Sequence, residues 1–344
     1  MDNNIIGANT ILMQNEGLNI ANINNPEEYS AEHISTKDVI SIITTAYNCE
    51  KFVEYAMNSV IKQLTSEFIF IEYIVVNDAS TDGTLAKIEE VAKTVNNKDI
   101  NVKIYTLDKN VGCGAARKYG IEKATGKYFM FLDADDYYIN NDFVIRAHID
   151  ITSSNADIVD YGIRFNSGYG EIFYSQAPQR IEITNPEYQV LALFKDNKIK
   201  FNVWSKIYTR NIINTYPYSD TRTYEDIRTV PIWLYNAKKL VIMPSCEVNY
   251  RANESSIIRK NDFETRLGTI TAISDLFEIF KDNMNILKAM YQRAMIDLEV
   301  VLVNHSSKDK YFNEMSALNT KMLSYIYPED YKKITYNIED KTIK

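Results

Sequence analysis

The sequence predicts an α/β protein with a mostly parallel sheet flanked by helices and followed by a mainly helical C-terminal region. Apolar, β-branched runs alternate with segments of helical apolar period between residues 38 and 136. Such alternation is typical of parallel strands joined by right-handed helical crossovers. Beyond residue 262, apolar residues recur at helical steps, as at Leu267, Ile270 and Ile273. We therefore expect a ligand site beyond the carboxyl ends of the strands.

The first strand is expected at residues 39–47, where the run VISIITTAY is apolar enough for a strand buried on both faces. A helix is expected at 52–64, because apolar residues recur there at four-residue steps. The elements that follow alternate in the same way: strand 70–78, helix 84–95, strand 101–108, helix 114–124 and strand 127–136.

The chain is expected to contain three regions. Residues 1–37 lack a strong apolar period and are expected to form an N-terminal extension. Residues 38–261 are expected to form one domain with halves at 38–136 and 137–261, because the regular alternation fades in the second half. Residues 262–344 are expected to be helical. Their apolar stripes are explained by packing, with a homodimer interface or contact with a membrane surface as alternatives.

Composition and charge limit the class of partner. The formal net charge is −8, which disfavours nucleic acid because phosphate binding requires a basic face. The three cysteines form no CxxC pair, so neither a disulfide framework nor a zinc site is indicated, and a reduced, cytoplasmic setting is the simplest interpretation. The longest apolar run, FIFIEYIVV, is too short to span a membrane. Any membrane association would therefore be peripheral, at the inner face of the cell membrane.

The stretch VVNDASTDGTLAKIEE, residues 75–90, has two interpretations. Its acidic and glycine positions match the spacing of an EF-hand calcium loop. An EF-hand requires a helix on each side of the loop, whereas the preceding residues are β-branched and aromatic, as in a strand. We therefore place Asp78 at the carboxyl end of a strand, where a ligand would bind.

The motif FLDADDYY places three carboxylates directly after an apolar strand. Asp133, Asp135 and Asp136 repel one another unless a cation compensates. Carboxylate oxygens suit hard cations such as Mg²⁺ or Mn²⁺, which would neutralise diphosphate oxygens. The alternative is a solvated turn with helix-capping aspartates, and the sequence leaves both open.

The glycine loop NVGCGAAR favours a different kind of cofactor. Gly112 and Gly114 follow a strand and precede a helix, and Asp133 lies roughly twenty residues on, as in a dinucleotide-binding fingerprint. The third glycine position is Arg117, so the fingerprint fails. A tight turn with a close helix approach explains the glycines equally well.

Together these motifs resemble family 2 glycosyltransferases with the GT-A fold. The resemblance covers VISIITTAYNCEKFVEYAMNSVIKQ, IVVNDASTDGT and NVGCGAARKYGIEKATGKYFMFLDADD in order and spacing, and continues more loosely through VWSKIYTR, TYEDIRTVPIWL and NYRANESSI. It implies a sugar transfer from a nucleotide diphosphate donor with inversion at the anomeric carbon. It also implies that residues 38–136 bind the nucleotide and that residues 137–261 bind the acceptor.

The resemblance assigns roles on the donor side. Thr45, Ala46 and Tyr47 would line the nucleotide pocket, and Asp78 would accept a hydrogen bond from the base, commonly uracil N3–H. Asp133, with Ala134 beside it, would contact the ribose or the metal. Asp135 or Asp136 would hold the divalent cation. Arg117 also stands at a family position, but the sequence does not show whether it binds phosphate or supports the structure.

The resemblance also assigns an acceptor side. Asp226 would be the general base that deprotonates the acceptor hydroxyl, and Glu225 would bind or orient the acceptor. The alternative is a pair of acids stabilising a helix N-terminus. Trp204 and Lys206 would shape the acceptor side, although a core tryptophan is equally plausible. Arg251 is a candidate for diphosphate contact, with a surface ion pair as its alternative.

The leading hypothesis is a metal-dependent inverting glycosyltransferase of the hexosyl- or N-acetylhexosaminyltransferase class. It would use Mn²⁺ or Mg²⁺ and a nucleotide-sugar, most simply a UDP-sugar, to extend a glycan, glycolipid or glycoprotein acceptor in polysaccharide or capsule biosynthesis. Two alternatives remain at this point. One is an NAD-dependent oxidoreductase, indicated by the glycine loop. The other is a non-catalytic nucleotide-binding subunit of a glycan assembly complex.

Overall fold

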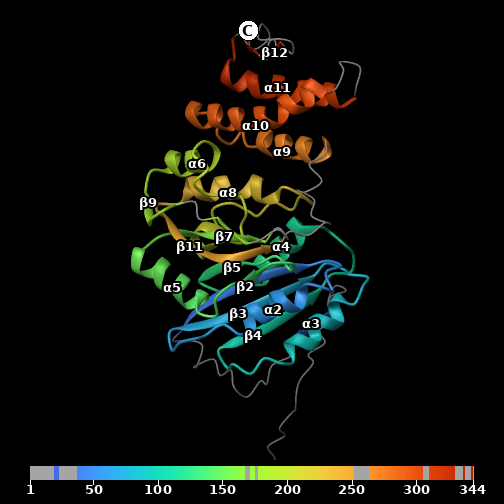
Figure 1. The fold of residues 1–344 in the computed structure, drawn as a ribbon, viewed down its shortest axis with the longest axis vertical. Helices are drawn as coiled ribbons and strands as arrows, with labels where there is room; N and C mark the ends of the chain where they lie inside the picture. The colour runs from blue at the N-terminus through green and yellow to red at the C-terminus, as the bar shows by residue number, and fades with distance from the viewer. Residues whose placement is uncertain are drawn as a thin grey trace, which may run out of the picture.

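The computed structural model describes residues 19–22, 37–166, 171–174, 177–251, 263–304, 310–329, 336–337 and 342–343. A twisted sheet flanked by helices forms one part of the molecule, and a stack of helices from the C-terminal region forms the other (Figure 1). This confirms the predicted α/β architecture with a helical C-terminal region. Most of the predicted extension, residues 1–18 and 23–36, lies outside the described residues, and Asn19–Asn22 form strand β1 beside β4.

The first half of the domain alternates strand and helix as predicted. All nine residues of β3 are buried, as expected of a strand covered on both faces. The final strand of this half ends at Phe131, earlier than predicted, so the acidic residues 133–136 lie in the loop beyond it. The elements are β2 (Asp38–Ala46), α2 (Val53–Ile61), β3 (Ile69–Asn77), α3 (Thr84–Ala92), β4 (Ile100–Thr106), α4 (Cys113–Lys123) and β5 (Tyr128–Phe131).

The order of the strands determines where a ligand can bind. Strands β4, β3, β2 and β5 lie side by side in that order and run parallel. The chain moves outward from β2 to β4 and then returns to the other side of β2 as β5. The loops after β2 and β5 therefore diverge at the carboxyl edge, and this reversal of strand order is where ligands of open α/β sheets bind.

The second half extends the same sheet beyond β5. Strand β10 is antiparallel to both β5 and β7, and β7 is parallel to β11. Strands β6 and β9 pair with β11, and β8 pairs with β7. The elements are β6 (Tyr137–Tyr138), α5 (Phe143–Ser154), β7 (Ile158–Asn166), β8 (Glu171–Tyr174), β9 (Ile181–Ile183), α6 (Pro186–Phe194), β10 (Lys206–Thr209), α7 (Arg210–Ile213), α8 (Glu225–Asn236) and β11 (Leu240–Arg251).

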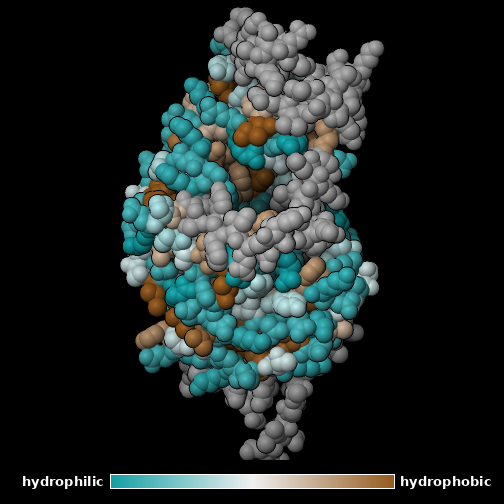
Figure 2. All heavy atoms as spheres, in the orientation of Figure 1, coloured by the Kyte–Doolittle hydropathy of each residue, from teal (hydrophilic) through white to brown (hydrophobic). Residues whose placement is uncertain are grey.

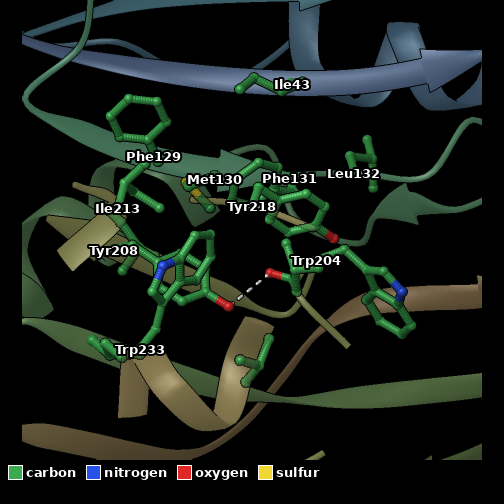
Figure 3. Close-up of a cluster of buried hydrophobic side chains, with 14 of the residues drawn as sticks. Ile43, Phe129, Met130, Phe131, Leu132, Trp204, Tyr208, Ile213, Tyr218 and Trp233 are labelled. Atoms are coloured by element: carbon green, nitrogen blue, oxygen red, sulfur yellow. Dashed lines mark hydrogen bonds between the residues drawn. The ribbon is translucent and has the colours of Figure 1, made fainter. Parts of the chain in front are cut away.

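An aromatic cluster attaches helix α8 to the sheet (Figure 3). The ring centroid of Phe131 on β5 lies 5.9 Å from that of Tyr208 on β10, and Tyr208 lies 5.2 Å from Trp233 on α8. Tyr218 packs between them, 6.2 Å from Phe131 and 5.6 Å from Trp233. Trp233 Nε1 also donates to the carbonyl oxygen of Tyr216 at 3.0 Å. Because truncating a buried aromatic residue costs about 3–5 kcal/mol, this cluster fixes α8 against the sheet through Trp233.

The C-terminal helices pack on α8 and α6 rather than on the sheet. The buried residues of this region include Ile273, Leu287 and Met290 on the helices and Phe277 in the turn after α9, and they form an apolar layer continuous with the main core. On the face shown in Figure 2, hydrophilic side chains dominate the coloured surface and the apolar patches are small and separate. None of the helices in the described part of the chain has the length and hydropathy needed to cross a membrane. The elements are α9 (Phe263–Asp275), α10 (Met284–Asn304), α11 (Lys310–Ile326), β12 (Tyr336–Asn337) and β13 (Thr342–Ile343).

Candidate active site

A pocket of about 450 Å³ opens at the carboxyl edge of the sheet, where the loops after β2 and β5 diverge. Most of the donor-side residues predicted from the sequence line it. Tyr47 is half exposed at its rim, whereas Asp78 is only 2% exposed at its base. The predicted residues on the pocket wall are Thr45, Ala46, Tyr47, Asp78, Asp133, Ala134 and Asp135.

Asp78 organises the glycine loop from the end of β3. Its carboxylate accepts hydrogen bonds from the backbone N–H of Val111 at 2.7 Å and of Gly112 at 2.9 Å. The side-chain amide of Asn110 donates to Asp78 Oδ2 at 2.9 Å. Asn110 also lines the pocket, although no pattern in the sequence singled it out. Asp78 therefore fixes one wall of the pocket.

The glycines of this loop are explained by a second loop that crosses them. A Cβ on Gly114 would lie 2.2 Å from the carbonyl oxygen of Thr221 and 2.6 Å from that of Ser219. Gly112 has a φ of +92° and lies against the side chain of Arg222. Residues 219–222 come from the second half of the domain. The small residues thus permit a close crossing between the two halves, which is the steric interpretation considered for these glycines.

The three aspartates of FLDADDYY occupy different environments. Asp133 and Asp135 line the pocket, whereas Asp136 is 1% exposed and does not. Asp136 Oδ1 accepts a hydrogen bond from the backbone N–H of Arg251 at 2.8 Å, and Oδ2 finds no partner among the described residues. Burial, together with the charges of Asp135 and Asp133, raises the pKa of Asp136 well above its usual range. Asp136 therefore ties the loop to β11, and the pocket wall carries the other two carboxylates.

The pocket-wall carboxylates fit a divalent cation that is completed by a substrate. Within the described ranges, no group of three or more His, Cys, Asp or Glu residues forms a ready-made metal site. Mg²⁺ commonly binds through one or two carboxylates together with substrate phosphates and water. Asp133 and Asp135 supply two such carboxylates beside an open pocket, so the donor set suits this kind of site.

Arg117 connects the first acidic cluster to the second. It is 3% exposed, and its Nη2 donates to Asp133 Oδ1 at 2.7 Å. Its Nη1 donates to Glu225 Oε1 at 2.6 Å and to the Tyr218 hydroxyl at 2.7 Å. Arg117 is absent from the residues that line the pocket. The guanidinium therefore holds together two carboxylates that are 92 positions apart in the chain.

The second acidic cluster begins helix α8. Tyr224 precedes the helix in the left-handed conformation, with a φ of 59°, and its hydroxyl donates to the carbonyl oxygen of Thr265 at 2.8 Å. Glu225 turns inward to Arg117, and Asp226 is half-buried beside it. Burial and the neighbouring Glu225 carboxylate raise the pKa of Asp226 to about 6. Asp226 is thus ionised at neutral pH and is a stronger base than an ordinary aspartate.

Arg251 lies beside the acidic loop. Its Nε donates to the carbonyl oxygen of Asp135 at 3.1 Å. Its guanidinium carbon lies 5.2, 4.9 and 5.8 Å from the ring centroids of three aromatic residues, Phe52, Tyr55 and Tyr137. Arg251 is therefore stacked among aromatic rings and hydrogen-bonded to the loop.

The structure buries both predicted acceptor-side residues. Trp204 is 8% exposed and stacks on Tyr250, with ring centroids 5.7 Å apart and planes 2° apart. Lys206 is fully buried, and its Nζ lies 2.9 Å from Asp160 Oδ1 and 2.6 Å from the carbonyl oxygen of Asn202. Lys206 therefore anchors the loop that carries Trp204.

Comparison with known proteins agrees with the motifs and the sheet topology. A family model described as Glycosyl transferase family 2 matches residues 41–215. The chain belongs to this family. The putative glycosyltransferase EpsH of Bacillus subtilis is 30% identical over 180 residues, which are 52% of this chain and 48% of EpsH. The poly(ribitol-phosphate) β-N-acetylglucosaminyltransferase TarS of Staphylococcus aureus is 33% identical over 173 residues, which are 47% of this chain and 29% of TarS. The chain thus spans less than half the length of either relative.

Solved structures show the same fold. The crystal structure of S. aureus TarS 1–349 in complex with UDP-GlcNAc superposes with a TM-score of 0.55 at 20% identity, covering 88% of this chain and 95% of that one. The mannosyltransferase PcManGT of Pyrobaculum calidifontis, in complex with GDP-Man and Mn²⁺, gives a TM-score of 0.54 at 14% identity, covering 85% and 88%. These likenesses confirm the predicted GT-A architecture. The family match does not favour the NAD-dependent alternative.

Proposed function

We propose that the protein is a metal-dependent inverting glycosyltransferase that moves a sugar from a nucleotide diphosphate, most simply UDP, to a hydroxyl of a glycan or glycoconjugate. One observation carries the proposal. Arg117 brings Glu225, and with it Asp226, to the acidic wall of the pocket at the switch point of the sheet. This arrangement supports a donor site and a candidate base that lie side by side.

Each acidic residue has a separate role in the proposed reaction. Asp226 accepts the proton of the acceptor hydroxyl, whose oxygen bonds to the anomeric carbon as the bond from that carbon to the diphosphate breaks. Glu225, fixed by Arg117, orients the acceptor beside Asp226. A divalent cation, held by Asp135 with Asp133, would neutralise the charge of the departing nucleotide diphosphate. We assign Asp136 to the support of the loop, because its carboxylate is buried and accepts a hydrogen bond from the backbone N–H of Arg251.

For the acceptor and the transferred sugar, we propose only a chemical class. The relatives include TarS, named as a poly(ribitol-phosphate) β-N-acetylglucosaminyltransferase, and GgaB of Bacillus subtilis, named as a minor teichoic acid biosynthesis protein. These names support a hydroxyl-rich cell-surface polymer as the acceptor class and a hexose or N-acetylhexosamine as the sugar.

Donor hydrolysis and transfer test the proposal directly. The full chain is incubated with Mn²⁺, a panel of UDP-, GDP- and CDP-sugars and a teichoic-acid-type polymer, and the released nucleotide and the modified polymer are quantified. We expect transfer from one UDP-sugar, loss of transfer in Asp226→Asn, and little change in Asp220→Asn, an exposed carboxylate on the preceding loop. Full transfer by Asp226→Asn would remove the assigned base. Binding of UDP without transfer to any acceptor would favour the non-catalytic alternative.

A further inference from the structure

Arg222 is an exposed cation on the wall of the candidate donor pocket. Of the described residues that line this pocket, Arg222 is the one with a positively charged side chain, whereas three carboxylates, Asp78, Asp133 and Asp135, face the same space. A nucleoside diphosphate adds negative charge to this pocket. Arg222 therefore offsets part of the negative charge of the pocket as a whole, and its guanidinium N–H groups can also donate to neutral acceptors such as base carbonyl oxygens.

The guanidinium is held in one orientation. Its Nη1 donates to Asn110 Oδ1 at 2.7 Å, and its Nη2 donates to the carbonyl oxygen of Asn110 at 2.8 Å. Asn110 in turn donates to Asp78 Oδ2 at 2.9 Å. Arg222 thus reaches from the acceptor half to the loop that Asp78 organises in the donor half.

The strand order shows at which end of the pocket Arg222 lies. Asp133 and Asp135 follow β5, whereas Asp78 follows β3 and Asn110 follows β4. With the order β4-β3-β2-β5, the two ends of the pocket wall are separated by three strand spacings, or about 14 Å. If the diphosphate lies at the acidic end, as proposed above, the nucleoside lies at the β3–β4 end beside Arg222.

The loop that carries Arg222 is attached to two helices, α8 and α4. The backbone N–H of Ser219 donates to Thr229 Oγ1 on α8 at 3.0 Å, and Asp220 forms an ion pair with Lys118 on α4 at 3.2 Å. The loop runs directly into Glu225 and Asp226 at the start of α8. A ligand held by Arg222 is therefore held by the same short segment that presents the candidate base.

We propose that Arg222 is a donor-binding residue contributed by the acceptor half, and that its guanidinium contacts the nucleoside moiety of the sugar-nucleotide. The contact uses guanidinium N–H groups toward base carbonyl oxygens or the charged plane against the base. This inference rests on the proposed function, because it takes the pocket to be the nucleotide site.

Isothermal titration of the full chain with UDP and with UMP, at fixed Mn²⁺, tests the inference. We expect Arg222→Ala and Arg222→Gln to raise the Kd for both nucleotides by about tenfold, as for loss of a hydrogen bond from a charged group. The control is Lys118→Ala, which removes an ion pair to the same loop outside the pocket and is expected to change the Kd by less than about twofold. Arg222→Gln keeps the aliphatic stem as far as Cδ and a polar end without the charge, and it covers the case in which Arg222→Ala unfolds, monitored by thermal unfolding.

The outcomes separate the inference from the proposed function. Wild-type binding that both Arg222 variants retain would contradict the inference alone. A loss seen with UDP but not with UMP would place the contact at the second phosphate and contradict the assignment to the nucleoside. An equal loss in Lys118→Ala would show that the loop, and not the guanidinium, carries the effect. A wild-type chain that binds no nucleoside diphosphate would contradict the proposed function itself.

Discussion

Replacing Asp226 by asparagine is expected to stabilise the fold while abolishing transfer. Burial and Glu225 raise the pKa of Asp226 from 3.8 to about 6, so the folded protein holds this carboxylate in an environment that disfavours its charge. A difference of about 2 pKa units corresponds to about 3 kcal/mol of lost stability once the group is ionised in both states. Asparagine resembles the protonated carboxyl and keeps an oxygen for the N–H of Ile227, which now donates to Asp226 Oδ1 at 2.7 Å.

The sign of the pH dependence follows from the raised pKa. Below about pH 4, Asp226 is protonated in both the folded and the unfolded chain, so the variant has no advantage. Between about pH 4 and 6 the unfolded chain loses its proton first and the wild type is progressively destabilised. Above about pH 6 the full difference is present. Asp226→Asn should therefore gain stability relative to wild type as pH rises through this window and keep a constant advantage above it.

Urea unfolding of both proteins between pH 4 and 8, followed by circular dichroism, measures this difference. We expect a free energy of unfolding higher by up to about 3 kcal/mol in the variant at pH 7 and a gap close to zero at pH 4. A variant that is less stable than wild type at pH 7, or a gap independent of pH, would refute the environment described for Asp226.

Four further predictions concern the same site. The value of kcat/KM should fall about tenfold per pH unit below about pH 6, because protonated Asp226 cannot accept the acceptor's proton, and a flat profile down to pH 5 would contradict this. Arg117→Lys should lower kcat at least about tenfold, because an ammonium is a point charge and lacks the planar guanidinium that bonds to both Asp133 and Glu225. Arg117→Ala should lower the free energy of unfolding, measured in urea, by about 3–5 kcal/mol. Asp135→Asn should raise the Mn²⁺ concentration for half-maximal donor hydrolysis at least about tenfold, and an unchanged titration would exclude its carboxylate from the metal site. Gly114→Ala should destabilise the fold by about 1–3 kcal/mol, since a Cβ would lie 2.2 Å from a carbonyl oxygen, and an unchanged thermal midpoint would contradict the crossing of the loops.

The local part of this structure could be predicted from the sequence. The alternation of apolar runs and helical periods predicted the succession of strands and helices from β2 to β5 along the chain, because buried parallel strands are apolar and are joined by helices. The carboxyl ends of those strands carry Asp78 and the acidic loop, and both line the pocket. The strand boundary before the acids was less predictable, since Leu132 is apolar and buried although it lies beyond β5.

The contacts between the two halves could not be predicted in the same way. Arg117 meets Tyr218 and Glu225 across more than a hundred positions, and Arg222 meets Asn110 across 112. No periodicity or short motif specifies such pairs, because they depend on how β10 and α8 are added to the sheet. Lys206 is a second such case, since nothing in the stretch VWSKIYTR indicates that this lysine is buried against Asp160.

The most direct test of the account is a crystal structure of the full chain with UDP and Mn²⁺. The account predicts a cation on Asp135, with or without Asp133, the diphosphate against that cation, and the uridine extending along the sheet edge toward Asp78 and Arg222. A nucleotide bound elsewhere, with the acidic loop free of metal, would contradict it.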